Sequence, residues 1–297
     1  MPTNPQDLLT ATVVKAFAGT PDARLRELMT ALVKHIHAYA REVNLKPDEW
    51  LAGLKFLTAT GQISTERRPE FILLSDTLGL SSMVVALEQA RASGGVGALA
   101  TEASVEGPFF WPGAPDVPLG ADIAEGVTGE PTYYTGRVTD VAGKPLAGAL
   151  LDIWSGDGDG KYDVQLSPTP KMQARGRLRT DAQGGYRFWS IRPTYYPVPD
   201  DGPVGVMMHA AHRSINRPGH IHMIVSAPGH VPVTTQIFVA HSPFIEEDAV
   251  FGKFDSLVAE FPQHPPGKAP DGREMKKPFY TAQFDFKLAP ATLKSSA

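Results

Sequence analysis

The spacing of hydrophobic residues divides the chain into a helical part and a β-rich part. From the N-terminus to about Ser93, apolar positions recur every three or four residues, as they do on one face of an α-helix. Three start signals introduce the predicted helices: Thr20-Pro21-Asp22, Lys46-Pro47-Asp48-Glu49 and Ser64-Thr65-Glu66. The clearest apolar stripe follows the first signal and consists of Leu25, Leu28, Met29, Leu32, Val33 and Ile36.

A glycine-rich break at residues 94–97 ends the helical pattern. Short alternating segments then follow, separated by proline and glycine. Because no helices alternate with these segments, they are typical of an antiparallel sandwich. The predicted fold class is therefore α+β, with a helical domain over residues 1–100 and an antiparallel β-sandwich over residues 101–297. The predicted strands are 132–139, 147–154, 184–191, 220–225 and 234–239.

Two histidines share one face of the fourth predicted strand. Successive side chains on a strand point to opposite faces, so His220 and His222 lie side by side. A satisfied core histidine is the simpler interpretation for one imidazole, but an adjacent pair with Arg217 just ahead also fits a metal site. His35 and His37 lie on a predicted helix, where residues two apart diverge and cannot bind one ion together. We expect those two on a solvated face.

Composition narrows the candidate chemistry. Of the 297 residues, 42% are hydrophobic and 20% are charged, as in an ordinary soluble globular protein. The net charge of −4 gives no basic footprint for nucleic acid, and no apolar run is long enough to span a membrane. The first residues lack a signal-peptide pattern, so a cytoplasmic location is expected. The chain has no cysteine. Any metal would therefore have to be held by histidine, tyrosine or carboxylate groups.

Two loops contain tyrosines that could complete such a site. Tyr162 follows a glycine-rich stretch, and Tyr196 lies in a proline-rich segment. Each tyrosine alone is compatible with aromatic packing. Together with His220 and His222 they make a set of two oxygen and two nitrogen donors. The glycine-rich stretch itself, Asp157-Gly158-Asp159-Gly160, lacks the spaced acids of a calcium loop and is interpreted as a turn.

The order of these motifs resembles that of the intradiol ring-cleaving dioxygenases. The helical third is similar to that of the catechol and hydroxyquinol branch, whereas the protocatechuate branch generally lacks it. The resemblance therefore extends over nearly the whole chain. The matching motifs are Gly160-Lys161-Tyr162, Ile191-Arg192-Pro193 leading to Tyr196, Arg217-Pro218-Gly219-His220-Ile221-His222, Ala227-Pro228-Gly229-His230 and Thr234-Thr235-Gln236.

The resemblance implies one non-haem ferric ion, Fe(III), per chain, bound by Tyr162, Tyr196, His220 and His222. A ferric ion favours anionic oxygen donors, and its charge lowers the pKa of a bound phenol. A catechol-type substrate would bind through both of its oxygens and displace Tyr196, which then accepts a substrate proton. O₂ would open the ring between the two hydroxyls to give a muconate containing both oxygen atoms, a reaction of aromatic-compound catabolism.

The resemblance also assigns residues around the substrate. Arg217 would lie beside it and stabilise negative charge on the ring, although a surface arginine that fixes a loop is the simpler interpretation. Gln236 matches a position near the ion. His209 and His212 are rival ligands, but they fall in a predicted loop without strand spacing. The expected pocket walls are Leu73, Val105, Gly107, Pro108, Phe109, Val198, Pro199 and Val250.

Hydroxyquinol (benzene-1,2,4-triol) is the expected substrate, with catechol and chlorocatechol as alternatives. Residues 106–110 and 197–203 are more similar to the hydroxyquinol branch. Asp76 follows Leu73 by three positions, so both can face the pocket from one helix. The Asp76 carboxylate could accept a hydrogen bond from the third hydroxyl, or it could be a solvated helix residue. The sequence leaves both interpretations open.

The helical third is expected to form a homodimer, because its apolar stripes are wider than one sandwich face would cover. Residues 1–100 are thus the expected dimerisation domain and residues 101–297 the expected catalytic domain, and the resemblance adds a phospholipid between paired helical regions. Two other classes remain open. Residues 136–140 and 145–149 are also similar to transthyretin-like binding modules, and a zinc hydrolase is a third interpretation. Both predict a colourless protein, whereas a ferric tyrosinate enzyme would be red.

Overall fold

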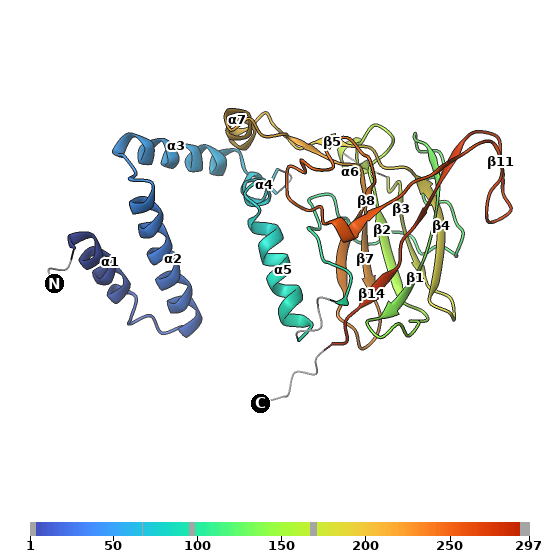
Figure 1. Cartoon of the computed structure of the whole chain (residues 1–297). Coiled ribbons are helices and arrows are strands. Elements are labelled where there is room, and N and C mark those ends of the chain that lie inside the picture. Colours follow the sequence, from blue (N-terminus) through green and yellow to red (C-terminus); the bar gives the residue numbers. More distant parts are fainter. Residues whose placement is uncertain (1–3, 67, 95–98, 167–170, 292–297) are drawn as a thin grey trace. The chain divides into compact units, whose positions relative to one another are not determined.

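The structure is a computed structural model that describes residues 4–66, 68–94, 99–166 and 171–291 (Figure 1). Most of the glycine-rich break predicted at residues 94–97 lies outside these ranges. The chain forms two compact units, Met1–Gln62 and Ile63–Ala297. The second unit includes helices that precede residue 100, and the boundary between a dimerisation and a catalytic domain at that residue stays a prediction.

The first unit is built from helices α1 (Pro5–Ala16), α2 (Ala23–Glu42) and α3 (Pro47–Ile63). Helix α2 begins two positions later than the sequence signal indicated, because Asp22 rather than Thr20 is the N-cap. The Asp22 side chain accepts a hydrogen bond from the backbone N–H of Leu25 at 2.8 Å. At the start of α3 the roles are reversed: the backbone N–H of Lys46, just before the helix, donates to the side chain of Glu49 within it.

Helix α2 leaves its apolar stripe uncovered in the single chain. Leu28 and Leu32 are each 50% exposed, and Ile36 is 54% exposed. His35 is solvated as predicted, but His37 is not fully so: it is half-buried, and its Nδ1 lies 2.9 Å from the hydroxyl of Thr10 on α1. The stripe therefore stabilises little within one chain.

The helices of the second unit are α4 (Glu70–Thr77), α5 (Leu80–Ala92), α6 (Asp163–Leu166) and α7 (Pro203–Ala210), with a 3₁₀ turn at Asp255–Leu257. The predicted helix start at Ser64-Thr65-Glu66 is wrong. Helix α4 begins only after Pro69, since a proline fixes its own φ and keeps the residue before it out of the helical region. Among the described helices, none alone has the length and apolar composition to cross a bilayer; α4 and α5, bent by 75°, meet that test only as a pair.

Two five-stranded sheets form the rest of the unit. The first has the order β3 (Arg175–Arg179), β2 (Leu150–Trp154), β7 (His220–Ser226), β8 (Val233–Val239) and β9 (Val258–Ala259). The second has the order β10 (Gln263–His264), β13 (Phe279–Gln283), β1 (Pro131–Asp140) and β14 (Phe286–Leu288), with β4 (Gly185–Ile191) paired to β1. Two further sheets have two strands each: β5 (Tyr196–Pro197) pairs with β6 (Asn216–Arg217), and β11 (Gly267–Lys268) pairs with β12 (Glu274–Met275).

The sheets are mixed, which corrects the prediction of a purely antiparallel sandwich. Strands β13 and β14 pair parallel to β1, and β9 pairs parallel to β8. These parallel partners come from the C-terminal part of the chain, where strands of two to five residues leave little pattern in the sequence. The prediction of a helical region followed by a sheet-rich domain is confirmed.

One hydrophobic core lies between the two sheets. Ile221, Met223 and Val225 of β7 pack there with Phe188 of β4 and Phe286 of β14, and all are at most 1% exposed. Because side chains alternate along a strand, β7 presents His220 and His222 on its other face. The core thus fixes the direction of both imidazoles.

Candidate active site

Four aromatic rings from three parts of the second unit meet beside β7. Tyr162 precedes α6, Tyr196 begins β5, and both histidines lie on β7. The ring centres of His220 and His222 are 4.7 Å apart, those of Tyr196 and His220 are 5.5 Å apart, and those of Tyr162 and Tyr196 are 5.6 Å apart. The structure therefore brings together all four residues that the sequence suggested as ligands.

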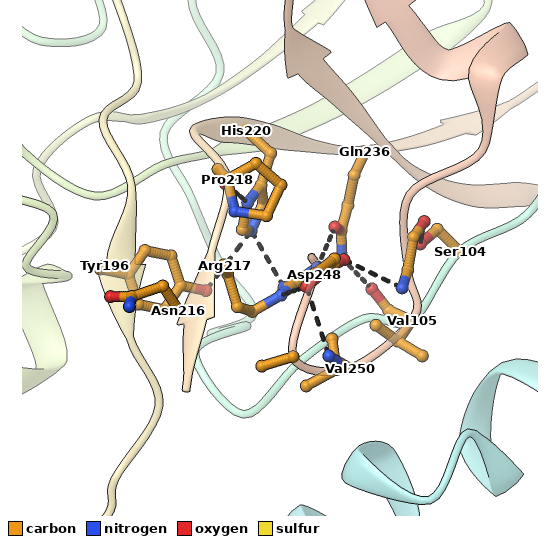
Figure 2. Close-up of polar contacts among 12 residues, drawn as sticks. Ser104, Val105, Tyr196, Asn216, Arg217, Pro218, His220, Gln236, Asp248 and Val250 are labelled. Atoms are coloured by element: carbon orange, nitrogen blue, oxygen red, sulfur yellow. Dashed lines mark hydrogen bonds and ion pairs between the residues drawn. The ribbon is translucent and has the colours of Figure 1, made fainter. Parts of the chain in front are cut away.

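The nitrogen atoms of the two histidines converge. His220 Nδ1 lies 2.7 Å from the carbonyl of Pro218, so this nitrogen carries the hydrogen and Nε2 carries a lone pair. His220 Nε2 is 3.1 Å from His222 Nε2. It is also 3.4 Å from the hydroxyl of Tyr196, as Figure 2 shows. A nitrogen lone pair held this close to two further donor atoms suits a shared cation better than it suits packing.

Burial sets the protonation states of these groups. The pKa values of His220 and His222 are held well below the usual range by burial, with Arg217 contributing for both and His220 for His222. Burial also raises the pKa of Tyr162 well above the usual range, and nearby Tyr196 adds to this. The histidines are therefore neutral, as metal ligands must be, and the buried Tyr162 would need a nearby positive charge to ionise.

Two polar atoms in this cluster lack hydrogen-bond partners among the described residues: the Tyr162 hydroxyl oxygen and His222 Nδ1. Buried polar groups are nearly always satisfied, so an unsatisfied phenol oxygen beside a histidine pair needs an explanation. A bound cation would explain it. Within the described part of the chain, no group of three or more histidine, cysteine, aspartate or glutamate side chains could hold a metal. This leaves the mixed tyrosine and histidine set as the candidate.

Arg217 lies behind the histidines and is 3% exposed, which rules out the interpretation as a surface arginine. Its Nε and Nη2 donate to the two carboxylate oxygens of Asp248 at 3.0 and 3.1 Å. Nη2 also donates to Gln236 Oε1 at 2.7 Å, and Nη1 lies 3.1 Å from His220 Nε2. Figure 2 shows the guanidinium surrounded by these partners. The pKa of Arg217 is raised because the neighbouring charges outweigh the opposing effect of burial.

A cavity of about 960 Å³ opens beside these rings. Tyr196 and Arg217 form part of its lining, and apolar side chains form most of the rest. Gln236, which was predicted among the substrate contacts, is not part of the lining; its amide donates to the carbonyl of Val105 instead. The other predicted wall residues all line it: Leu73, Asp76, Val105, Gly107, Pro108, Phe109, Val198, Pro199 and Val250.

Asp76 is one of several polar residues that line the cavity, together with Glu66, Arg68, Glu70, Gln165, Asp200, Asp201 and Arg217. It is 8% exposed, so the interpretation as a solvated helix residue is wrong. Burial raises its pKa, while a hydrogen bond from Ser81 and the charge of Arg217 oppose that rise and Asp248 adds to it. Its carboxyl group is therefore a largely buried polar group among the apolar wall residues that the sequence predicted.

The rival ligands lie elsewhere. His209 belongs to helix α7 rather than to the predicted loop, and its Nε2 is 3.0 Å from Asp200. His212 follows the helix with a left-handed backbone, φ 53°. Neither is in the ring cluster. Asp157 accepts backbone hydrogen bonds from Asp159 and Lys161, which confirms the turn.

Sequence reasoning missed the residues that support this site from behind. Asp248 sits in a run of three acids that has no periodicity to distinguish it. Asp163 and Arg175 form a buried ion pair, with 2.7 Å between Arg175 Nε and Asp163 Oδ2, and Arg175 also donates to the carbonyl of Phe109. Phe109 in turn stacks on Tyr162 at 4.5 Å. A spatial pairing of residues far apart in the chain leaves no local signal.

Arg213 is a further missed support. Its Nη1 donates to the carbonyl of Thr77 at the end of α4, and its Nη2 donates to the carbonyl of Ala249 at 3.0 Å. Its guanidinium also lies 4.6 Å from the centre of the Phe251 ring. Arg213 thus joins the last turn of α4 to the segment that contains Asp248.

Comparison with known proteins agrees with this geometry. Residues 105–290 match the family model described as "Dioxygenase", and residues 22–95 match the model described as "Catechol dioxygenase N terminus". The chain is 47% identical to hydroxyquinol 1,2-dioxygenase of Rhodococcus opacus over 95% of its own length and 93% of that protein. It therefore belongs to the intradiol ring-cleavage dioxygenases.

Solved structures place the chain within the same family. It matches hydroxyquinol 1,2-dioxygenase of Pseudomonas putida DLL-E4 with a TM-score of 0.88 and 38% identity, covering 96% of this chain and 98% of that one. It matches catechol 1,2-dioxygenase of Pseudomonas arvilla C-1 with a TM-score of 0.80 and 27% identity, covering 97% and 93% of the two chains. The family and the intradiol activity predicted from the sequence are confirmed.

Proposed function

We propose that this chain cleaves hydroxyquinol between its 1- and 2-hydroxyls with O₂, at a ferric ion held by Tyr162, Tyr196, His220 and His222. The product is a hydroxymuconate, the enol form of maleylacetate. The observation that carries the proposal is the convergence of two imidazole nitrogens on two tyrosines at the end of an apolar cavity. Relatives named hydroxyquinol 1,2-dioxygenase support the choice of substrate.

The donor set suits Fe(III) on chemical grounds. Two phenolates offset much of the ion's charge, and neutral imidazoles complete the site without adding charge. The buried, unpartnered Tyr162 hydroxyl fits this role, because a cation would supply the interaction that its surroundings lack. When bound, the ferric ion supplies the Lewis-acid and electron-transfer chemistry that makes an aromatic diol reactive towards O₂.

The two tyrosines would differ in what they do. Tyr162 is fully buried, whereas Tyr196 is half-buried and lines the cavity. Tyr196 is therefore the tyrosine whose oxygen can accept a proton from a substrate hydroxyl. The apolar walls around it exclude water from the opened ring and keep that proton transfer local.

Arg217 supports the reaction electrostatically. Its Nη1 edge faces the histidine pair, while Asp248 and Gln236 hold its other edge. A fixed cation in a buried site stabilises negative charge as it develops on the ring, and no solvent has to reorganise. Its role is therefore in the transition state more than in binding.

Asp76 distinguishes the triol from catechol. Only hydroxyquinol has a third hydroxyl that can hydrogen-bond to this carboxyl group. A pocket built to bond a hydroxyl rejects the analogue without it, because a buried polar group is then left unpaired. Ser81, which hydrogen-bonds to Asp76, restrains the carboxyl group on the wall. Catechol remains the alternative substrate, supported by the similarity to catechol 1,2-dioxygenase.

The helical unit provides the dimer contact in this proposal. Its support is the exposed stripe of α2, since an apolar face of this kind marks an interface. A cavity of about 760 Å³ lies between α1 and α2, lined by Val14, Ala18 and Ala31 together with Lys15, Arg26 and Lys34. Apolar walls with basic side chains suit a phospholipid, whose head group is anionic. A cytoplasmic location stays a prediction.

The test is a visible spectrum, an iron assay and product analysis on the purified protein. We expect a red protein with one iron per chain that converts hydroxyquinol under ¹⁸O₂ to a ring-opened product containing both labels. A colourless protein with zinc, or without metal, would instead favour the hydrolase or the transthyretin-like binding module. Faster turnover of catechol than of hydroxyquinol would refute the substrate but leave the reaction class intact.

A further inference from the structure

The guanidinium of Arg217 is fixed on one edge by a carboxylate that lies 31 positions further along the chain. Asp248 contacts it with both oxygens, through Nε at 3.0 Å and Nη2 at 3.1 Å (Figure 2). This two-point geometry fixes the plane of the guanidinium as well as its position. Gln236 contacts only Nη2, and a single contact would leave the plane free to turn.

The remaining donors of Arg217 are the ones that face the proposed reaction site. Arginine has five N–H groups, and the bonds to Asp248 and Gln236 use the Nε hydrogen and both hydrogens of Nη2. The two hydrogens of Nη1 remain, and Nη1 lies 3.1 Å from His220 Nε2. The carboxylate therefore determines which edge of the guanidinium points at the histidines.

Asp248 is itself held in place. Its side chain is 3% exposed and accepts hydrogen bonds from the backbone N–H groups of Val250 at 3.3 Å and Gly252 at 3.0 Å. The backbone N–H of Ala249 donates to the carbonyl of Asn216, next to Arg217. Burial raises the pKa of Asp248, but Arg217 and the backbone N–H groups of Val250 and Gly252 more than offset this rise, so the side chain stays ionised.

Close packing at Gly252 makes the arrangement sensitive to small changes. A Cβ atom at this position would lie 2.9 Å from Arg217 Nη2, 3.1 Å from the Ser104 hydroxyl and 3.3 Å from Asp248 Oδ2. Two of these atoms, Arg217 Nη2 and Asp248 Oδ2, are hydrogen-bonded to each other. A glycine at position 252 therefore leaves space for the contact between the Arg217 guanidinium and the Asp248 carboxylate.

We propose that Asp248 is a positioning residue for ring cleavage, which aims the Nη1 edge of Arg217 at the reacting ring by holding the other edge. This inference rests on the proposed function. Asp248 does not contact the ring cluster, and it is not among the residues that line the cavity. Its effect therefore passes through Arg217. A merely structural ion pair would stabilise the fold without affecting the transition state selectively.

The main experiment is steady-state kinetics of Asp248→Asn with hydroxyquinol, on protein whose iron content is measured. Asparagine keeps the shape but cannot accept both N–H groups of the arginine. We expect kcat to fall on the order of tenfold to a hundredfold with a smaller change in KM, because the lost interaction acts in the transition state. Asp255→Asn is the matched control: it removes a carboxylate seven positions further on that is 95% exposed, and kcat should stay unchanged.

A double-mutant cycle tests whether Asp248 acts through Arg217. In an Arg217→Gln background, the further change Asp248→Asn should lower kcat by less than twofold, because the group it positions is gone. A crystal structure of Asp248→Asn should show the guanidinium turned, with Nη1 moved from His220. Unchanged kcat in the single variant, independent losses in the double variant, or an unmoved Arg217 would each overturn the proposal, as would loss of iron in Asp248→Asn.

Gly252→Ala covers the case in which Asp248→Asn does not fold. This substitution changes no charge but pushes on Arg217 Nη2, so it should lower kcat severalfold at normal iron content. Wild-type kcat in a folded Gly252→Ala protein would overturn the proposal. If the wild type itself holds no iron or cleaves no ring, the proposed function fails, and the crystal structure of Asp248→Asn still shows whether Asp248 orients Arg217.

Discussion

The Nε2 atoms of His220 and His222 lie 3.1 Å apart, and the Nδ1–H group of His220 donates to the carbonyl of Pro218. In the proposed site, both imidazoles bind the same cation. We expect His222→Ala to lose both iron and the red colour, measured by an iron assay and a visible spectrum. His230→Ala is the control, because that imidazole lies outside the ring cluster, with its Nδ1 3.0 Å from the carbonyl of Pro228. Full iron occupancy with an unchanged visible band in His222→Ala would refute the ligand set.

The wall residue Asp76 gives a prediction about substrate choice. Asp76→Leu should lower kcat/KM for hydroxyquinol relative to catechol by roughly ten- to a hundredfold, since one hydrogen bond to a charged group is worth about 1.5–3 kcal/mol. The measurement is kcat/KM for both substrates in both proteins. Leu73→Val, a change at a neighbouring wall position without polar atoms, is the control and should alter the ratio far less. If the ratio of kcat/KM for hydroxyquinol to that for catechol is unchanged in Asp76→Leu, the apolar walls rather than Asp76 determine which substrate is preferred.

The same residue predicts a pH dependence of stability. Burial raises the pKa of Asp76, so the folded protein binds this proton more tightly than the unfolded chain does. The stabilisation is fully present below the unfolded pKa, about 3.9, and is lost as the pH rises through the higher folded pKa. At neutral pH, Asp76→Asn should therefore be more stable than the wild type, with a difference that shrinks on acidification. Urea unfolding at several pH values measures this; a less stable Asp76→Asn at pH 7 would contradict it.

The pair of Asp163 and Arg175 gives a prediction about stability alone. Both side chains are almost fully buried, at 2% and 1% exposure. Asp163→Asn should lower the free energy of unfolding by about 3–5 kcal/mol, because it leaves a buried arginine charge without its partner. The double variant Asp163→Asn/Arg175→Met should recover part of this loss. If urea unfolding showed the double variant to be less stable than Asp163→Asn alone, the explanation by an unpaired charge would fail.

The exposed stripe of α2 predicts a dimer. Sedimentation at micromolar concentration should show twice the chain mass for the wild type, and Leu28→Glu with Leu32→Glu should give a monomer, because both leucines are half exposed in the single chain. Lys55→Glu, an exposed change on α3, should leave the dimer intact. A wild-type monomer under these conditions would remove the dimer from the proposal.

What the sequence could reveal was local. The alternation from His220 to Val225 identified β7 and the face that carries the histidines, because a strand's side-chain period appears in consecutive residues. The helix starts were predicted less well. Asp22 rather than Thr20 is the N-cap of α2, and α4 begins only after Pro69. Backbone geometry decides between neighbouring polar residues in such cases.

What the sequence could not reveal was pairing over long distances. Strand β1 finds parallel partners about 150 positions away, and nothing within β1 specifies their direction. The bond between Arg217 and Asp248 is of the same kind, since nothing in the run Glu246-Glu247-Asp248 indicates which acid the fold brings to the arginine. Asp76 was open between two interpretations until its burial was known.

Arg213 gives the molecule a constraint on how it can diversify. One guanidinium holds the carbonyl at the end of α4, and also the carbonyl that follows Asp248. The cavity wall at α4 and the segment that contains Asp248 are therefore linked through one side chain. A substitution that shifted the end of α4 would also act on that segment, so we expect a reshaped wall to need a second substitution near Arg213.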